Sequence, residues 1–373
     1  MFQFVAAGLL ASLFAYLSYS QKKEWYLIFS FVILWYIAAF QDCIASDFIA
    51  YKDIFENISK VKGIFLRNSG FPPKDGVEIG WYLLNRIIAF FTSNFYFVTP
   101  IVYGIIFYVF YQLIQYAPSK WRWVAIFYLY FTPGWMTSIM SAQRQSLAVA
   151  FWILLVIALL NKKYIKAAIF TILGISFHNS MLYSLPFLLL LLIPLDRINF
   201  NKHKVLWFSV FILCFFISYL YVQELVEGVS MFFDSLDSEV ANTYAFYIQE
   251  LEQTNLTRKW TTIIFKLILY VFIIWSFVFS KEKRTAYANL FYILFIISFD
   301  LIGSMGGYGS FARIFRYIMF FSLPAISNTA FRLKKPARYV FIGYMIFSSL
   351  YSFNAAVHTE QFANYLNYHT IFF

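Results

Sequence analysis

Long apolar runs recur along nearly the whole of this chain, and this pattern constrains its fold more than any other. Of its 373 residues, 61% are hydrophobic and 13% are charged, and the mean hydropathy is +0.67. A bilayer core about 30 Å thick takes an apolar helix of about 20 residues, whose backbone groups are bonded within the helix. The sequence therefore predicts an all-α, polytopic integral membrane protein, with one transmembrane domain over residues 1–373 and roughly 10–12 transmembrane helices.

Basic residues cluster in short segments between the apolar runs and indicate the orientation of the chain. Cytoplasmic loops of membrane proteins carry an excess of lysine and arginine, so we place these basic turns in the cytoplasm. They are Lys22–Lys23, Lys120–Arg122, Lys162–Lys166, Arg197–Lys204, Lys281–Arg284 and Arg332–Arg338. Two longer loops, residues 41–78 and 222–258, are then expected outside, together with both chain ends. The net charge of +11 is interpreted as topology, and nucleic acid is not an expected partner.

The sequence has no pattern that is typical of a cofactor site. There is no metal-ligand spacing, no phosphate-binding glycine loop with its lysine and no paired-cysteine motif, since the two cysteines are Cys43 and Cys214. These observations argue against an ATP-driven pump and against a cytosolic enzyme that uses sugar nucleotides. We expect neither a cofactor nor a metal.

Three apolar segments raise particular expectations. Ile79–Thr92 is too short for a comfortable crossing and predicts a re-entrant or interfacial helix. Trp123–Ser138 is predicted to form one span that returns to the outer side. Tyr164–Pro194 is longer than one span needs, and the polar patch around His178 predicts two short helices that meet there. One long tilted helix is the alternative, and it would invert the topology of everything downstream.

The stretch from Ser141 to Ser180 predicts a helical hairpin. One arm runs from Arg144 to the basic turn at Lys162–Lys163, and the other returns from that turn to His178. At about 1.5 Å per residue the arms are roughly 24 and 20 Å long, so Arg144 and His178 are expected at similar depth. An arginine and a histidine at one edge of a bilayer predict a site for an anionic headgroup.

Several arginines do not fit the pattern of basic cytoplasmic loops, namely Arg67, Arg86, Arg144, Arg258, Arg313 and Arg316. A guanidinium held at the membrane edge costs about 2.5 kcal/mol or more unless it is paired. Its planar fork suits phosphate oxygens, so this group predicts a phosphate or pyrophosphate ligand on the outer side. The alternative is that each arginine pairs with an outer-loop carboxylate. We favour the functional interpretation for Arg144 and for Arg313 and Arg316, which share one helix face.

Other polar residues at the predicted outer edge add candidate groups. His178 could be a general base for a sugar hydroxyl or a donor to phosphate, with a structural, hydrogen-bonded histidine as the alternative. Asp47 and Tyr51 are spaced i, i+4 and would face the same way on a short helix, and Glu78 abuts the membrane. These carboxylates are candidates for holding a sugar or for proton transfer, and solvated loop charges or caps are the alternative.

The motifs of the hairpin resemble the EpsG/Wzy-type group, the polysaccharide polymerases of bacterial capsule, exopolysaccharide and O-antigen pathways. The most specific part of the resemblance is Arg144–Ala148, followed by Lys162–Lys163 and then by Phe177–Ser180 with an apolar run to Pro186. Each motif is short, but together they follow the family's order over most of the chain.

Three further elements are similar to motifs of the same family. Asp47 with Tyr51 resembles its Asp-Tyr…Tyr element, with Phe48 in place of the usual tyrosine. Val77–Trp81 is similar to its Glu-Pro-Gly-like element, although isoleucine stands where proline is usual. Arg313–Tyr317 resembles its late Arg…Tyr segment.

The resemblance implies a GT-C-like membrane glycosyltransferase in the bacterial inner membrane, with its active site facing the periplasm. It would join oligosaccharide repeat units carried on undecaprenyl pyrophosphate, so residues 41–78 and 222–258 would be periplasmic loops. The leaving pyrophosphate carries the developing charge, and arginines could stabilise it without a metal. Besides the lipid-linked oligosaccharide and membrane lipid, a chain-length regulator protein is a candidate partner.

The same resemblance carries the expected roles of individual residues. The expected catalytic residues are His178, Arg144, Asp47 and Glu78. The residues expected to bind pyrophosphate are Arg144, Arg313, Arg316 and Tyr317. The residues expected to bind the glycan are Tyr51, Gln143, Gln145 and Asn179.

Two alternative functions remain open. An O-antigen ligase uses the same lipid donor with a different acceptor, and a histidine in a long outer loop would favour it, but neither long outer loop contains one. A flippase or other transporter of lipid-linked oligosaccharides would distribute polar residues through both leaflets and show an inverted repeat. The polar groups of this chain gather on one predicted side, and the sequence shows no repeat.

Overall fold

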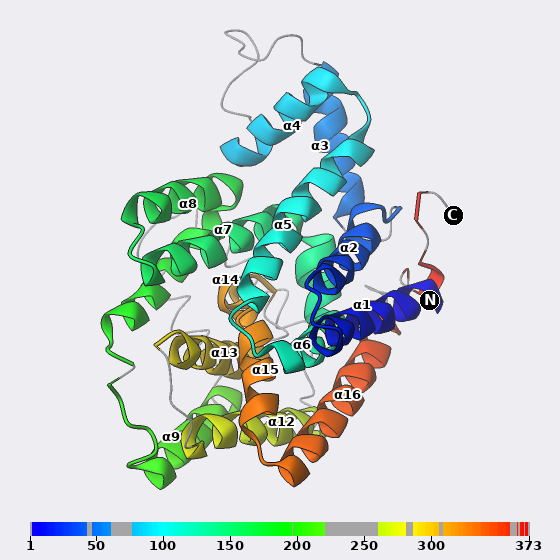
Figure 1. The fold of residues 1–373 in the computed structure, drawn as a ribbon. Helices are drawn as coiled ribbons and strands as arrows, with labels where there is room; N and C mark the ends of the chain where they lie inside the picture. The colour runs from blue at the N-terminus through cyan, green and yellow to red at the C-terminus, as the bar shows by residue number, and fades with distance from the viewer. Residues whose placement is uncertain are drawn as a thin grey trace. The chain divides into compact units, whose positions relative to one another are not determined.

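The computed structural model describes residues 2–42, 47–60, 77–195, 197–220, 260–280, 286–305 and 309–358, with residues 364, 366–368 and 370–371 near the C-terminus. These residues form helices and turns, apart from one isolated antiparallel bridge between Gln41 and Thr370 (Figure 1). The prediction of an all-α fold is therefore confirmed.

Four helices in the described part of the chain are long and apolar enough to cross a membrane. They are Phe2–Ser20, Phe95–Ile114, Gln143–Leu160 and Lys335–Val357. Seven shorter apolar helices of 10–17 residues accompany them in the same described ranges. The prediction of a polytopic membrane protein is confirmed, and a total of roughly 10–12 crossings requires that the shorter helices also cross.

The chain divides into two compact units, and the first comprises residues 1–182 with residues 345–373. Its described helices are α1 (Phe2–Ser20), α2 (Trp25–Ala39), α3 (Phe48–Lys60), α4 (Ile79–Phe91), η1 (Phe95–Phe97), α5 (Val98–Ile114), η2 (Ser119–Trp121), α6 (Arg122–Tyr130), η3 (Trp135–Ser141), α7 (Gln143–Leu160), α8 (Tyr164–Phe177) and the end of α16 (Lys335–Val357). In this unit α1 packs on α2 and α6, α5 packs on α2 and α7, and α4 packs on α3 and α8.

The second unit comprises residues 183–344. Its described helices are most of η4 (Asn179–Leu192), α9 (Lys204–Leu220), α12 (Trp260–Phe279), α13 (Ala286–Met305), α14 (Gly309–Met319), α15 (Ser322–Arg332) and the start of α16. In this unit α13 packs on α9, α12, α14 and α15. The predicted loop 222–258 lies outside the described residues.

Helices α7 and α8 form the predicted hairpin and lie side by side in Figure 1. Lys162 in the turn has a φ of 58°, and the Lys163 N–H donates to the Ala158 carbonyl at 2.8 Å, which closes the C-terminus of α7. Helix α8 ends at His178, whose backbone is extended with φ −160° and ψ 118°, and the 3₁₀ helix η4 follows. The prediction of two short helices that meet at His178 is confirmed.

The segment Trp123–Ser138, expected to return to the outer side, is not one continuous helix. Helix α6 ends at Tyr130, and the π-helix η3 begins only at Trp135. The turn between them is at Phe131 and Thr132, and Pro133 and Gly134 follow it with helical backbone. Proline lacks an N–H to donate, and its ring clashes with the carbonyl four residues earlier, so Pro133 prevents α6 from continuing.

The predicted outer loop 41–78 contains the amphipathic helix α3. Its residues Phe48, Tyr51, Phe55 and Ile58 recur at helical spacing and are all buried. Helix α4, which follows this loop, packs directly on α3, so the two helices form a layer of the first unit. That arrangement positions the candidate site.

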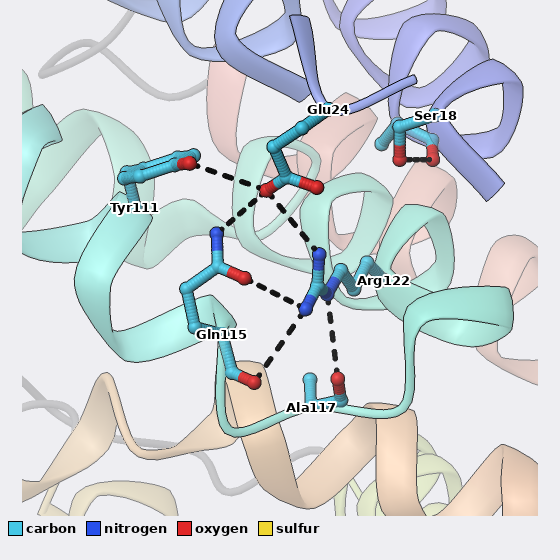
Figure 2. Close-up of polar contacts among 7 residues, drawn as sticks. Ser18, Glu24, Tyr111, Gln115, Ala117 and Arg122 are labelled. Atoms are coloured by element: carbon cyan, nitrogen blue, oxygen red, sulfur yellow. Dashed lines mark hydrogen bonds and ion pairs between the residues drawn. The ribbon is translucent and has the colours of Figure 1, made fainter. Parts of the chain in front are cut away.

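An ion pair links the start of α6 to the turn between α1 and α2. The Arg122 Nη1 atom lies 3.6 Å from the carboxylate of Glu24, which also accepts from Gln115 at 2.8 Å and from Tyr111 at 3.2 Å. Figure 2 shows these side chains converging on Glu24. The Arg122 Nη2 atom donates to the Gln115 side-chain oxygen at 2.8 Å. This network ties helix ends together at the predicted cytoplasmic side.

Candidate active site

An ion pair between Arg144 and Glu78 forms the centre of the candidate site. Arg144 is the second residue of α7, and Glu78 immediately precedes α4. The Arg144 Nη1 atom lies 2.5 Å from Glu78 Oε2, and the two side chains are 24% and 11% exposed. Glu78 stands at the N-cap position of α4 without capping it, because its carboxylate is turned toward α7. Two segments that are 66 positions apart in the chain are joined here.

The N-terminus of α7, where Arg144 lies, favours a nearby negative charge. Ala142 provides no side-chain cap for the helix, and the π-helix η3 leads directly into it. The Ser146 hydroxyl donates to the Ser138 carbonyl, which fixes the first turn of α7 against η3. Since a helix N-terminus carries a partial positive charge, the Arg144 guanidinium adds to a field that already attracts anions such as the Glu78 carboxylate.

The ring of Tyr51 lies beneath the guanidinium of Arg144, with 5.7 Å between the guanidinium carbon and the ring centroid. Trp81 on α4 contacts the same tyrosine, with the two ring centroids 5.2 Å apart. Burial raises the pKa of Tyr51, the charge of Asp47 raises it further, and Arg144 opposes both effects. The Tyr51 hydroxyl is therefore neutral at physiological pH.

The contacts of His178 at the end of α8 distinguish its two ring nitrogens. The backbone N–H of Ser180 donates to His178 Nδ1 at 3.2 Å, and the Ser180 hydroxyl lies 2.7 Å from the same atom. Because Nδ1 accepts the backbone hydrogen bond, the proton of the neutral ring is on Nε2. This tautomer suits a hydrogen-bond donor to phosphate better than it suits a general base.

The remaining predicted residues are distributed over both units. In the first unit, Gln143 and Gln145 are buried and Asn179 is exposed. In the second unit, Arg313, Arg316 and Tyr317 lie on α14. The side chain of Arg313 is outside the described part, Arg316 is half-buried and Tyr317 is fully buried. The structure therefore brings together Arg144, Glu78 and Tyr51, while the roles of the α14 residues stay predictions.

Of the other arginines predicted on the outer side, the structure describes Arg86 but not Arg67 and Arg258. Arg86 is buried and donates to the Ile58 carbonyl on α3 at 2.6 Å, a contact that stabilises the α3–α4 layer. Arg67 and Arg258 lie outside the described residues. Among the His, Cys, Asp and Glu residues that the structure describes, no group of three could hold a metal ion.

A family model described as the EpsG family matches residues 1–370. The chain belongs to the EpsG family. EpsG is a Wzy-type polymerase family, so the resemblance found in the sequence is confirmed. Membership indicates a polysaccharide polymerase of the membrane. No curated protein and no solved structure matches the chain.

The hydrogen bonding of Arg144 indicates which ligand this EpsG-family protein can bind. The Arg144 Nε atom is buried and has no hydrogen-bond partner among the described residues, although Nη1 is bonded to Glu78. The guanidinium also hydrogen-bonds Tyr51, and its Nε–H is a donor that remains for a second anion. Trp81 belongs to the motif Val77–Trp81, but the sequence predicts no role for it, because its contact with Tyr51 arises only from the packing of α4 on α3.

Proposed function

We propose that this EpsG-family protein joins oligosaccharide repeat units carried on undecaprenyl pyrophosphate, at the periplasmic face of the bacterial inner membrane. In each step the bond between the sugar C1 and the pyrophosphate oxygen breaks, and its electron pair leaves with the pyrophosphate. A hydroxyl oxygen of the incoming unit forms the new bond to C1, and its proton passes to a carboxylate and then to water. Family membership supports the reaction class.

The observation that carries this proposal is the incompletely bonded, partly buried guanidinium of Arg144 at the start of α7. Such a group stabilises charge that develops on a leaving pyrophosphate, and it does so without a metal. In our proposal His178 donates to a phosphate oxygen, while Glu78 positions Arg144. Asp47 is exposed beside Tyr51 and accepts the proton of the incoming hydroxyl.

Reconstitution of the reaction from purified components tests this function. The full chain in detergent is mixed with the lipid-linked repeat unit of its own host, in the presence of a chelator and without nucleotide, and the products are separated on a gel. We expect a ladder of lengthened chains. Transfer of a single unit to a different acceptor would identify a ligase instead. Movement of the lipid across a vesicle membrane without any ladder would identify a transporter.

Labelling of single cysteines from either side of the membrane tests the orientation. In a background in which Cys43 and Cys214 are replaced by serine, we introduce Ser93→Cys in the turn after α4 and Lys163→Cys in the turn between α7 and α8. Both positions are exposed. A membrane-impermeant maleimide added to intact spheroplasts should label position 93 and should reach position 163 only after lysis. The reverse pattern would contradict a periplasmic site.

A further inference from the structure

Helix α4 carries two buried polar groups that lack partners. The indole nitrogen of Trp81 and the side-chain oxygen of Asn85 have no hydrogen-bond partner among the described residues, and both side chains are fully buried. The Asn85 amide nitrogen donates to the Trp81 carbonyl at 2.8 Å, so it is the oxygen that remains open. Because the two residues are spaced i, i+4, they share one face of the helix. Trp81 on this face contacts Tyr51 beneath Arg144.

The first turn of α7 also carries buried polar atoms without hydrogen-bond partners among the described residues. Gln143 is fully buried, and neither its side-chain nitrogen nor its side-chain oxygen has a hydrogen-bond partner in the described structure. Its neighbour Arg144 has the open Nε atom. A buried polar group without a partner destabilises the fold, and native structures contain few such groups. Tyr51 links Trp81 of α4 to Arg144 of α7, the chain neighbour of Gln143. The unsatisfied groups of these two helices therefore indicate that a polar ligand binds there.

The chemistry of these groups identifies the class of occupant. Trp81 offers a donor, Asn85 offers an acceptor and the Gln143 amide offers both. A phosphate anion supplies only acceptors, so it satisfies neither Asn85 nor the Gln143 oxygen, whereas a sugar hydroxyl both donates and accepts. The rings of Tyr51 and Trp81 add apolar surface of the kind that packs on a sugar face.

We propose that Trp81, Asn85 and Gln143 form a saccharide subsite next to Arg144, which binds the sugar adjoining the pyrophosphate. This inference rests on the proposed function, because it assigns the sugar part of the substrate whose pyrophosphate part contacts Arg144. Trp81 and Asn85 are additions to the residues that the sequence predicts to bind glycan. The subsite binds hydroxyl groups of the sugar and makes no contact with the charged pyrophosphate of the lipid carrier.

Binding of two lipids that differ only in their sugar tests the subsite. The affinity of the purified full chain is measured for the undecaprenyl-pyrophosphate-linked repeat unit of its own host and for undecaprenyl pyrophosphate without sugar. Trp81→Phe keeps an aromatic ring and removes the N–H, and Asn85→Leu removes the acceptor at similar volume. Loss of one hydrogen bond corresponds to a loss of about 3–10-fold in affinity. We expect this loss for the sugar-bearing lipid and unchanged affinity for the sugar-free lipid.

A matched control separates recognition from packing. Trp152 is a fully buried tryptophan of the same unit, about 12 Å beyond Arg144 along α7. Trp152→Phe should leave the ratio of the two affinities unchanged. Melting temperatures are recorded for every variant, and if Trp81→Phe does not fold, then Asn85→Leu and Gln143→Met decide the question.

The outcomes for the subsite and for the proposed function are distinguishable. If the Trp81 and Asn85 variants lose affinity equally for both lipids, or lose affinity for neither, the subsite is overturned. Trp81 and Asn85 are then groups that bind water only. If Arg144→Ala does not weaken binding of the sugar-free lipid, the pyrophosphate role of Arg144 is overturned. Even if that role is overturned, a loss of affinity for the sugar-bearing lipid alone in Trp81→Phe would support the subsite.

Discussion

Replacement of Arg144 with alanine is expected to lower the initial rate of unit joining by at least about 100-fold, the usual effect of losing a donor that stabilises transition-state charge. The change removes the guanidinium proposed to contact the leaving pyrophosphate. It also leaves the Glu78 carboxylate, only 11% exposed, without its partner and free to repel an anionic substrate. Arg144→Lys keeps the charge without the planar fork and should retain an intermediate rate. The rate is measured from the polymer ladder of the reconstituted protein.

A second Arg–Glu pair in the same unit provides the control. Arg122→Ala breaks the pair with Glu24 at the predicted cytoplasmic side, where Figure 2 shows a comparable network, and should lower stability while retaining unit joining per folded molecule. A purely structural Arg144–Glu78 pair would make the double variant Arg144→Ala/Glu78→Ala active again, since no buried charge would remain unpaired. We expect the double variant to stay inactive. A folded Arg144→Ala protein that polymerises at the normal rate would contradict the proposed mechanism.

Substitution of Gly80 by alanine is expected to slow unit joining without removing any functional group. A Cβ atom at this position would lie 2.7 Å from the backbone oxygen of Ser176 and 2.8 Å from its carbonyl carbon, because α4 and α8 approach closely there. Overpacking of this kind typically costs about 1–3 kcal/mol and is relieved by displacement of the backbone. Since Glu78 lies two residues before Gly80, the displacement moves its carboxylate away from Arg144. We expect a lower melting temperature and a loss of about 10-fold or more in the rate of unit joining, by comparison with misplaced catalytic groups.

Two further variants test this explanation. A Cβ atom added at Gly343 on α16 would meet no other atom within 4 Å, so Gly343→Ala should be tolerated and should slightly stabilise its helix. Ser176→Ala removes the side-chain part of the obstruction but leaves the backbone carbonyl, so it should not restore the Gly80→Ala protein. Normal activity and stability in Gly80→Ala alone would show that α4 can shift without disturbing the ion pair.

The hairpin could be predicted because its signals are local. A long apolar run, a basic turn and a polar break at His178 each specify structure within a few residues, and α7, α8 and η4 follow them. The interruption after Tyr130 also has a local signal in the sequence, Pro133, within a segment whose apolar composition predicts a span. Where composition and a local helix-breaking signal compete within one membrane segment, the local signal decided the structure here.

The candidate site was predictable as a set of residues but not as a geometry. Arg144 and Glu78 are singled out by their type and by their place at the membrane edge, whereas their mutual contact depends on how α4 packs between α3 and α8. The same packing buries Trp81 and Asn85. Whether a buried polar atom has a hydrogen-bond partner depends on the tertiary structure, so it cannot be predicted from the spacing of residues in the sequence.

The shortness of α4 and α8 has a consequence for the surrounding lipid. With 13 and 14 residues, these helices span only about 20 Å, whereas the hydrocarbon core is about 30 Å thick. Where a helix of this length crosses, the bilayer next to it thins, or the helix ends lie below the headgroups of more distant lipids. In the proposed function, membrane thickness is therefore part of substrate access, because it sets how far the polyprenyl carrier must rise before its charged end meets Arg144.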